Sequence, residues 1–103
     1  MNYWIYKILD KNNNEEFYIG STNKLSSRKS HHKKNVHNKR SKKYWCKLYQ
    51  YMRANGGFEN FHFDVLEAGT CDDKVFIKQR EQDYINNLKP TLNSINACTN
   101  NEI

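Results

Sequence analysis

Two short apolar stretches separated by a polar one open the chain. The segments Trp4–Leu9 and Phe17–Gly20 are rich in β-branched and aromatic residues, and Asp10–Asn14 between them is rich in turn-forming types. Short β-prone runs joined by such a turn are typical of a β-hairpin. We therefore expect the chain to begin with two antiparallel strands.

A polar segment with helical spacing follows the hairpin. Ser21 or Thr22 can cap a helix that begins near Asn23 or Lys24 and ends at about Val36. The next predicted helix runs from about Ser41 to Asn55, because its large apolar residues recur at helical spacing; these are Tyr44, Trp45, Leu48, Tyr49 and Met52.

Two further elements complete the expected order. Gly56 and Gly57 end the second helix, and alternating apolar and polar residues from Phe61 to Val65 then predict a third strand with Phe61, Phe63 and Val65 on the core. The last helix is predicted from Asp72 or Asp73 to Leu88, before Pro90. The fold class is thus α+β: a single domain over residues 1–103 with a small three-stranded antiparallel sheet flanked by helices, in the order β-β-α-α-β-α.

A carboxylate interrupts the apolar face of the last helix. Glu81 falls in the sector that also holds Ile77, Tyr84, Ile85 and Leu88. Burying a charge is costly unless it is paired, hydrogen-bonded or bound to a cation. Glu81 therefore requires a partner, which is either one of the many basic residues or a metal ion.

The first helix shows a similar anomaly. Arg28 and His32 lie between Leu25 and Val36 on its inward face. An arginine presents a fork of donors that suits phosphate, and a histidine can exchange a proton near neutral pH. Either residue alone is as readily explained as a boundary or hydrogen-bonded core residue, and Tyr6 and Tyr18 alone as ordinary strand residues. Together with Glu81, they supply what hydrolysis of a phosphodiester needs.

The charge of the chain points to a polyanionic partner. Seventeen Lys and Arg against eleven Asp and Glu give a formal net charge of +6, which favours nucleic acid first and acidic lipid second. The densest basic segment predicts a DNA-binding surface whose members are Lys29, Lys33, Lys34, His37, Lys39, Arg40, Lys42 and Lys43. No apolar run reaches the roughly 20 residues of a membrane span, and no signal peptide is recognisable. We expect an intracellular protein, cytoplasmic or nuclear.

The same positions resemble the GIY-YIG nucleases. Trp4-Ile5-Tyr6 and Tyr18-Ile19-Gly20 are similar to the two tripeptides of that family, at a hairpin-length spacing, although Trp4 replaces the usual first glycine. The resemblance continues in order through the first helix with Arg28 and His32, the last helix with Glu81, and two asparagines near the end, Asn93 and Asn96.

The resemblance implies a DNA endonuclease that uses one divalent cation, Mg²⁺ or Mn²⁺, held by Glu81. It further implies that Tyr6 or Tyr18 activates the attacking water, Arg28 binds the scissile phosphate, His32 assists proton transfer and Asn96 orients the site. His37 is a further candidate in the loop after the first helix. Trp4 either points away from the cleft or narrows it.

Two other functions remain open at this stage. The charge and aromatic content would suit a catalytically silent nucleic-acid-binding module, and Glu81, Arg28 and His32 would suit a buried structural network. The family resemblance is also compatible with a gene carried by a virus or mobile element, and with a homodimer or separate partner that supplies specificity.

Overall fold

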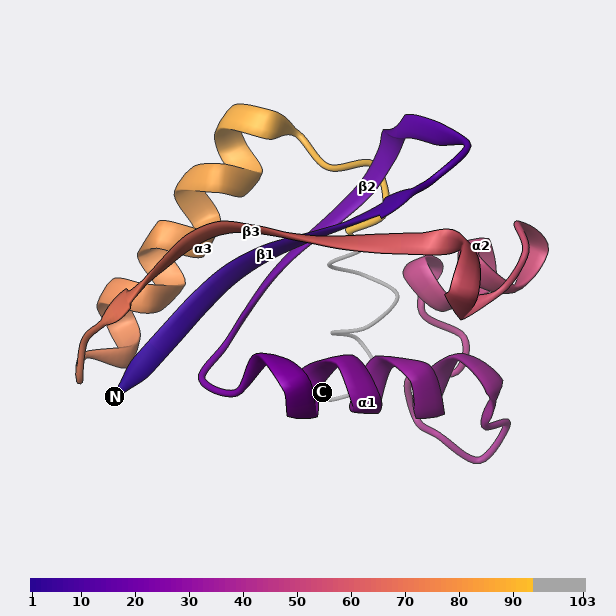
Figure 1. Cartoon of the computed structure of the whole chain (residues 1–103), viewed down its shortest axis with the longest axis horizontal. Coiled ribbons are helices and arrows are strands. Elements are labelled where there is room, and N and C mark those ends of the chain that lie inside the picture. The colour runs from indigo at the N-terminus through magenta and orange to yellow at the C-terminus, as the bar shows by residue number, and fades with distance from the viewer. Residues whose placement is uncertain (94–103) are drawn as a thin grey trace.

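The computed structural model describes residues 1–93, which form a three-stranded sheet with helices around it (Figure 1). In chain order the elements are β1 (Asn2–Asp10), β2 (Asn13–Thr22), α1 (Leu25–His37), α2 (Lys47–Ala54), the 3-10 helix η1 (Phe58–Asn60), β3 (Phe61–Thr70) and α3 (Lys74–Leu88). The predicted α+β class, the antiparallel sheet and the order β-β-α-α-β-α are confirmed.

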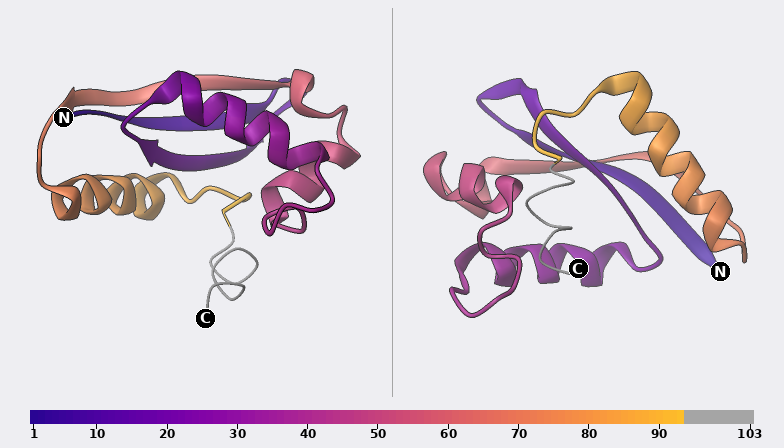
Figure 2. Two further views of the ribbon diagram at one scale, coloured as in Figure 1. Left: turned by 90° about the horizontal axis from the view of Figure 1, so that it is seen from below. Right: turned by 180° about the vertical axis from the view of Figure 1, so that it is seen from behind.

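The central strand β1 separates two small cores. The sheet order is β2-β1-β3, and β1 pairs antiparallel with both neighbours. Tyr6 and Ile8 of β1 belong to a core on the side of α1 and α2, whereas Tyr3 and Ile5 belong to a core on the side of α3. Figure 1 and the right view of Figure 2 show α3 and α1 on opposite sides of the strands. Burial on both faces explains why β1 is apolar at nearly every position.

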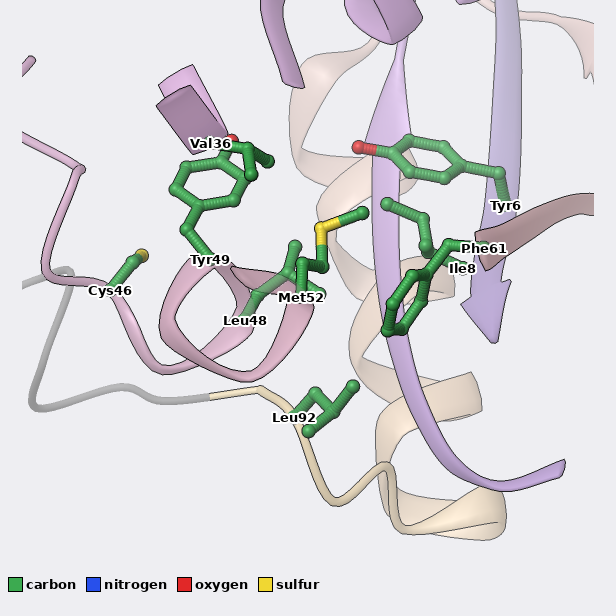
Figure 3. Packing of buried hydrophobic residues seen from close by; sticks show 9 residues of the cluster. All are labelled: Tyr6, Ile8, Val36, Cys46, Leu48, Tyr49, Met52, Phe61 and Leu92. Carbon is green, nitrogen blue, oxygen red and sulfur yellow. The ribbon is translucent and has the colours of Figure 1, made fainter. Parts of the chain in front are cut away.

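The larger core joins the hairpin to α2. Its fully buried residues include Ile8 of β1 and Met52 of α2, with Phe61 and Leu92 nearby. Figure 3 shows the Met52 side chain directed from α2 toward β1. The buried Asp10 carboxylate adds a polar link, because it accepts a hydrogen bond of 2.7 Å from the Tyr51 hydroxyl on α2.

The second helix is shorter than its sequence pattern predicts. Residues 38–46 form turns, and α2 begins at Lys47 rather than near Ser41. Arg53 holds these turns in place: its guanidinium donates to the carbonyls of Val36 (2.6 Å) and Tyr44 (2.7 Å) and lies 3.6 Å from the centre of the Tyr44 ring. The predicted end of the second helix before Gly56 and Gly57 is confirmed: α2 ends at Ala54, and the two glycines have positive φ angles of 95° and 80°.

The third strand carries a β-bulge. Ile5 pairs with Glu67 whereas Tyr6 pairs with Val65, so Leu66 is an extra residue in β3. The prediction that Val65 faces the core is wrong, because the helical cover on this side lies around Phe61 and leaves Val65 50% exposed. Glu67, beyond the bulge, faces α3 instead.

Glu67 fastens α3 to the sheet. Its carboxylate accepts hydrogen bonds from the Tyr3 hydroxyl (2.7 Å), the Tyr84 hydroxyl (3.0 Å) and the Arg80 guanidinium (2.5 Å). The Arg80 guanidinium is the main cause that lowers the pKa of Glu67 to about 2. At its N-terminus α3 has the predicted Asp73 cap, whose carboxylate accepts from the backbone N–H of Val75 (2.9 Å).

Replacing Glu67 by glutamine should lower the free energy of unfolding by about 1–2 kcal/mol at neutral pH, because three donors lose a charged acceptor at a partly exposed site. Urea denaturation measures the change. Asp83→Asn is the matched control: Asp83 contacts the same Arg80 at 3.6 Å from a more exposed position, and its loss should cost about 0.5 kcal/mol or less. Equal effects of the two substitutions would contradict this assignment.

Candidate active site

The end of the hairpin brings two tyrosines together over a glycine. A Cβ atom at Gly20 would lie 2.7 Å from the Tyr6 hydroxyl oxygen and 2.9 Å from Cε1 of Tyr18. Real Cβ atoms do not approach other atoms so closely, so a side chain at position 20 would displace both rings. The glycine of the Tyr18-Ile19-Gly20 tripeptide is therefore required by the position of Tyr6, its partner residue on β1.

A buried chain of hydrogen bonds continues from Tyr6 into the helices. The Tyr6 hydroxyl lies 2.8 Å from Nε2 of His32 on α1, and the Tyr49 hydroxyl on α2 lies 2.7 Å from Nδ1 of the same imidazole. Tyr6 is 1% exposed and His32 is 4% exposed. Each ring nitrogen thus has one tyrosine partner, and because a hydroxyl can donate or accept, the imidazole tautomer determines the direction of both hydrogen bonds.

Arg28 stands between two grooves. The first, about 160 Å³, is lined by Tyr18, Arg28, His32 and Tyr49 among others. The second, about 230 Å³, runs along the β2–α1 turn and the start of α3, and Arg28 lines it too. Within residues 1–93 the half-buried Arg28 guanidinium has no hydrogen-bond or ion-pair partner. An arginine held in this way is ready to bind an anion.

Glu81 reaches this region from the other face of the sheet. Its side chain is 19% exposed, accepts a hydrogen bond from the Ser21 hydroxyl at the end of β2, and lies 3.7 Å from Nζ of Lys78. The prediction that Ser21 or Thr22 caps α1 is wrong, because the N-cap residue is Lys24 and no side chain caps the helix. Ser21 binds Glu81 instead, and Thr22 forms the turn before the helix by accepting from the Lys24 N–H at 3.1 Å.

Burial and neighbouring charges shift the pKa values of Tyr6, Tyr18 and His32. Burial is the main cause that raises the pKa of Tyr18 to about 12, and the Glu81 charge is the second. Burial likewise raises the pKa of Tyr6, and the Arg28 charge opposes the rise at both tyrosines. The pKa of His32 falls to about 3, first through burial and then through the charges of Arg28 and Lys43. At rest, the imidazole and both phenols are neutral.

The donor set around Glu81 suits a hard divalent cation of the magnesium type. No cluster of three His, Cys, Asp or Glu side chains occurs within residues 1–93. A single half-buried carboxylate beside the Ser21 hydroxyl leaves the remaining positions for water and phosphate oxygens, as magnesium prefers.

The basic residues predicted to bind DNA are split over the surface. Lys43 lines the inner groove with Arg28, but Lys29 and Lys33 line a different groove beside Phe63. The exposed residues Lys34, Arg40 and Lys42 line none of these three grooves. The basic stretch is divided in this way because Lys29, Lys33 and Lys34 lie on α1, whereas Arg40, Lys42 and Lys43 lie on the turns that follow it.

Three predicted positions lie apart from the tyrosines or outside the described part of the chain. His37 is exposed near Gly57, with Cε1 3.8 Å from the position of a Cβ there. Trp4 is half-buried between Thr22 and Ala68 in the sheet, and it lines neither groove around Arg28. Asn96 lies outside the described residues. Asn93 binds the edge strand, its side chain bonding the Ile19 N–H (2.8 Å) and carbonyl (2.9 Å).

Sequence reasoning missed four residues around the grooves: Ser21, His31, Tyr49 and Lys78. Tyr49 fits the apolar stripe of α2, so only its buried hydroxyl distinguishes it from an ordinary core residue. Lys78 lies one turn before Glu81, a spacing that places the two side chains side by side on a helix. From this spacing, Lys78 could have been predicted as a neighbour of Glu81.

The buried neutral His32 should make stability depend on pH. Its pKa is about 3 in the folded protein and near 6.5 when unfolded, so the unfolded chain binds more protons between these values. The resulting stability is full above pH 6.5 and falls as the pH drops toward 3, by up to about 5 kcal/mol. Urea denaturation of the native chain and of His32→Gln across this range tests the effect. The difference between the two should shrink in acid; a constant difference would contradict it.

Comparison with known proteins agrees with this geometry. The model of the GIY-YIG catalytic domain family matches residues 2–96. The solved catalytic domain of homing endonuclease I-TevI has a similar fold, with a TM-score of 0.69 and 24% sequence identity over 89% of this chain and 94% of that chain. No curated protein sequence matches, and no helix within residues 1–93 is long and apolar enough to cross a membrane. Because the family model spans nearly the whole chain, this protein belongs to the GIY-YIG family and is an endonuclease domain whose implied substrate is DNA.

Proposed function

We propose that the chain hydrolyses DNA phosphodiester bonds with one divalent cation, Mg²⁺ or Mn²⁺, bound at Glu81. The main support is that Ser21, whose hydroxyl donates to Glu81, lines the same groove as Arg28, although Glu81 and Arg28 come from helices on opposite faces of the sheet. A cation and a free guanidinium beside neutral phenols form an arrangement that can polarise a phosphate and position water.

Glu81 holds the cation, with Ser21 orienting its carboxylate. A cation held there would supply Lewis acidity for the charge that develops on the phosphate. Without one, the Glu81 charge is the second cause of the raised pKa of Tyr18, after burial. Arg28, which has no partner within residues 1–93, binds the scissile phosphate through two donors.

Tyr6 and His32 carry the proton, and Tyr18 positions the water beside Arg28. As water attacks phosphorus, its proton passes to the Tyr6 oxygen while the Tyr6 proton passes to Nε2 of His32, 2.8 Å away. This transfer requires the imidazole tautomer whose Nδ1–H donates to the Tyr49 oxygen. The P–O bond to the leaving oxygen breaks, and that oxygen takes a proton from solvent.

Substrate binding itself prepares His32 to accept the proton. Arg28 and Lys43 are the second and third causes of its lowered pKa, after burial. A phosphate bound between them offsets both charges and raises the pKa of the imidazole toward its usual range. Phosphate binding thus favours proton transfer to His32, while burial continues to lower the pKa of the imidazole.

A plasmid-nicking assay with Mg²⁺ or Mn²⁺ tests the assignment. The native chain should nick supercoiled DNA, and Arg28→Ala should lower the rate about 10²–10³-fold, as for loss of one group that stabilises the transition state. Arg28→Lys should recover only part of the rate, because lysine lacks the planar fork. Glu81→Ala should abolish nicking and weaken Mn²⁺ binding measured by calorimetry without DNA.

Asp83→Ala is the matched control for Glu81, since Asp83 is an acidic residue on the same helix with a 41% exposed side chain. Its nicking rate and Mn²⁺ affinity should equal those of the native chain. Unchanged nicking in both Glu81→Ala and Arg28→Ala would exclude this active site. Binding of DNA with no nicking by the native chain would indicate a silent binding module instead.

Tyr49→Phe tests the relay through the residue whose hydroxyl lies 2.7 Å from Nδ1 of His32. Loss of its hydroxyl frees His32 Nδ1 from its partner, so the tautomer that accepts from Tyr6 is no longer favoured. We expect kcat to fall about 10-fold with KM nearly unchanged, because positioning of a base affects the transition state. Steady-state cleavage of a labelled duplex measures both constants. A change in KM alone would assign Tyr49 to substrate binding.

A further inference from the structure

The groove on the α3 side of Arg28 carries charge that the catalytic assignment does not use. It has a volume of about 230 Å³ and lies between the β2–α1 turn and the first two turns of α3. Arg28 stands at one side, and Lys74 and Lys78 of α3 stand at the other. The rest of the wall is formed by small polar side chains of the turn, by Ile77 and by Met1, whose amino group is paired with Asp72.

The nearby carboxylates already have partners, so the groove remains positive. Asp72 binds the N-terminal amino group at 2.6 Å, and Asp73 accepts hydrogen bonds from the backbone at the start of α3. Glu81 accepts from Ser21 and lies 3.7 Å from Lys78. Lys74 has no hydrogen-bond or ion-pair partner within residues 1–93. A groove that carries positive charge between low-dielectric walls attracts a polyanion.

We propose that this groove holds the DNA strand on one side of the scissile phosphate, with Lys74 and Lys78 each contacting a backbone phosphate. This inference rests on the proposed function, because Arg28 at the shared wall is taken as the scissile-phosphate ligand. Lys74 and Lys78 are four residues apart and therefore project from one helix face at roughly 5–6 Å spacing. That separation is close to the distance between neighbouring phosphates of one strand.

The order of groups along α3 gives the strand a path. Lys74, Lys78 and Glu81 follow one another within two helical turns, and Glu81 is the group nearest the tyrosines. A strand that leaves the reaction centre at Glu81 and Arg28 therefore passes Lys78 first and Lys74 second. Lys78 also neutralises part of the Glu81 charge before a cation binds, at the 3.7 Å separation of the two groups.

The basic stretch on α1 is a weaker candidate for the same role. Lys33 is paired with Glu59 at 3.8 Å, and Lys29 lies over the Phe63 ring at 5.3 Å. Their groove also holds His62, which is paired with Asp64 at 2.7 Å. Lys78 likewise has an acidic partner, Glu81 at 3.7 Å, so pairing alone does not separate the two grooves. The groove at α3 is favoured because Arg28 lines it, whereas Arg28 does not line the groove beside Phe63.

Salt-dependent binding tests the contacts directly. Affinity for a fluorescent duplex is measured by anisotropy in EDTA, so that no cleavage occurs, over a series of salt concentrations. The double variant Lys74→Ala/Lys78→Ala should show a slope of log K against log salt that is about 1.8 less steep, since each phosphate contact contributes about 0.9. Lys74→Arg/Lys78→Arg should retain the native slope.

The matched control removes two lysines elsewhere. Lys47 lies at the start of α2 and Lys89 follows α3, and both are exposed outside the grooves. Lys47→Ala/Lys89→Asn should keep the native slope; asparagine is chosen because residue 89 has a left-handed backbone, with φ of 53°. Equal slopes for this control and for Lys74→Ala/Lys78→Ala would overturn the proposal.

Neutral methylphosphonates placed on either side of the cleavage point locate the contacts. On one side they should weaken binding of the native chain but not of Lys74→Ala/Lys78→Ala; on the other side they should weaken both equally. Identical losses of affinity on both sides would overturn the proposal. A fall in kcat for Lys74→Ala/Lys78→Ala with an unchanged salt slope would also overturn it, since Lys78 would then act only on Glu81.

Failure of the native chain to nick DNA refutes the proposed function alone, because the slopes are measured without cleavage.

Discussion

The contact between the Tyr6 ring and the backbone at Gly20 determines the position of most other groups in the site. Because the ring lies on the one position of β2 that lacks a Cβ, its hydroxyl reaches beyond the sheet to His32. His32 in turn fixes α1 against α2 through Tyr49. A single close approach inside the hairpin thereby connects two strands and two helices, and the hydroxyl that we propose to carry the proton also holds the fold together.

The site lies at an edge strand where the two cores meet. Arg28 belongs to the helix on one face of the sheet, and Glu81 belongs to the helix on the other. They act on the same groups because β2 is an edge strand, so its end at Ser21 is accessible from both faces. Glu67 contributes to this arrangement, because its hydrogen bonds to Arg80 and Tyr84 hold α3 against the sheet and so position Glu81 at that edge.

The order of elements and the inward polar residues were predictable from the sequence, whereas contacts between distant segments were not. Glu81, Arg28 and His32 stand out because a charged or polar side chain breaks an apolar helical face. The short α2 follows from the Arg53 guanidinium binding two carbonyls, which no periodicity reveals. The β-bulge at Leu66 depends on pairing with β1, and the split of the basic stretch depends on where α1 ends and the turns of residues 38–46 begin.

Asn93 has a consequence for how this domain meets other molecules. Its side-chain amide bonds both backbone groups of Ile19, as a neighbouring strand would, and the Leu92 N–H donates to the Phe17 carbonyl at 2.9 Å. The outer edge of β2 is therefore already occupied beside Tyr18 and Gly20. A second polypeptide cannot add to the sheet at that place. The strand that carries half of the family motif is shielded from intermolecular β-pairing, and side chains, rather than main-chain hydrogen bonds, govern what the site recognises.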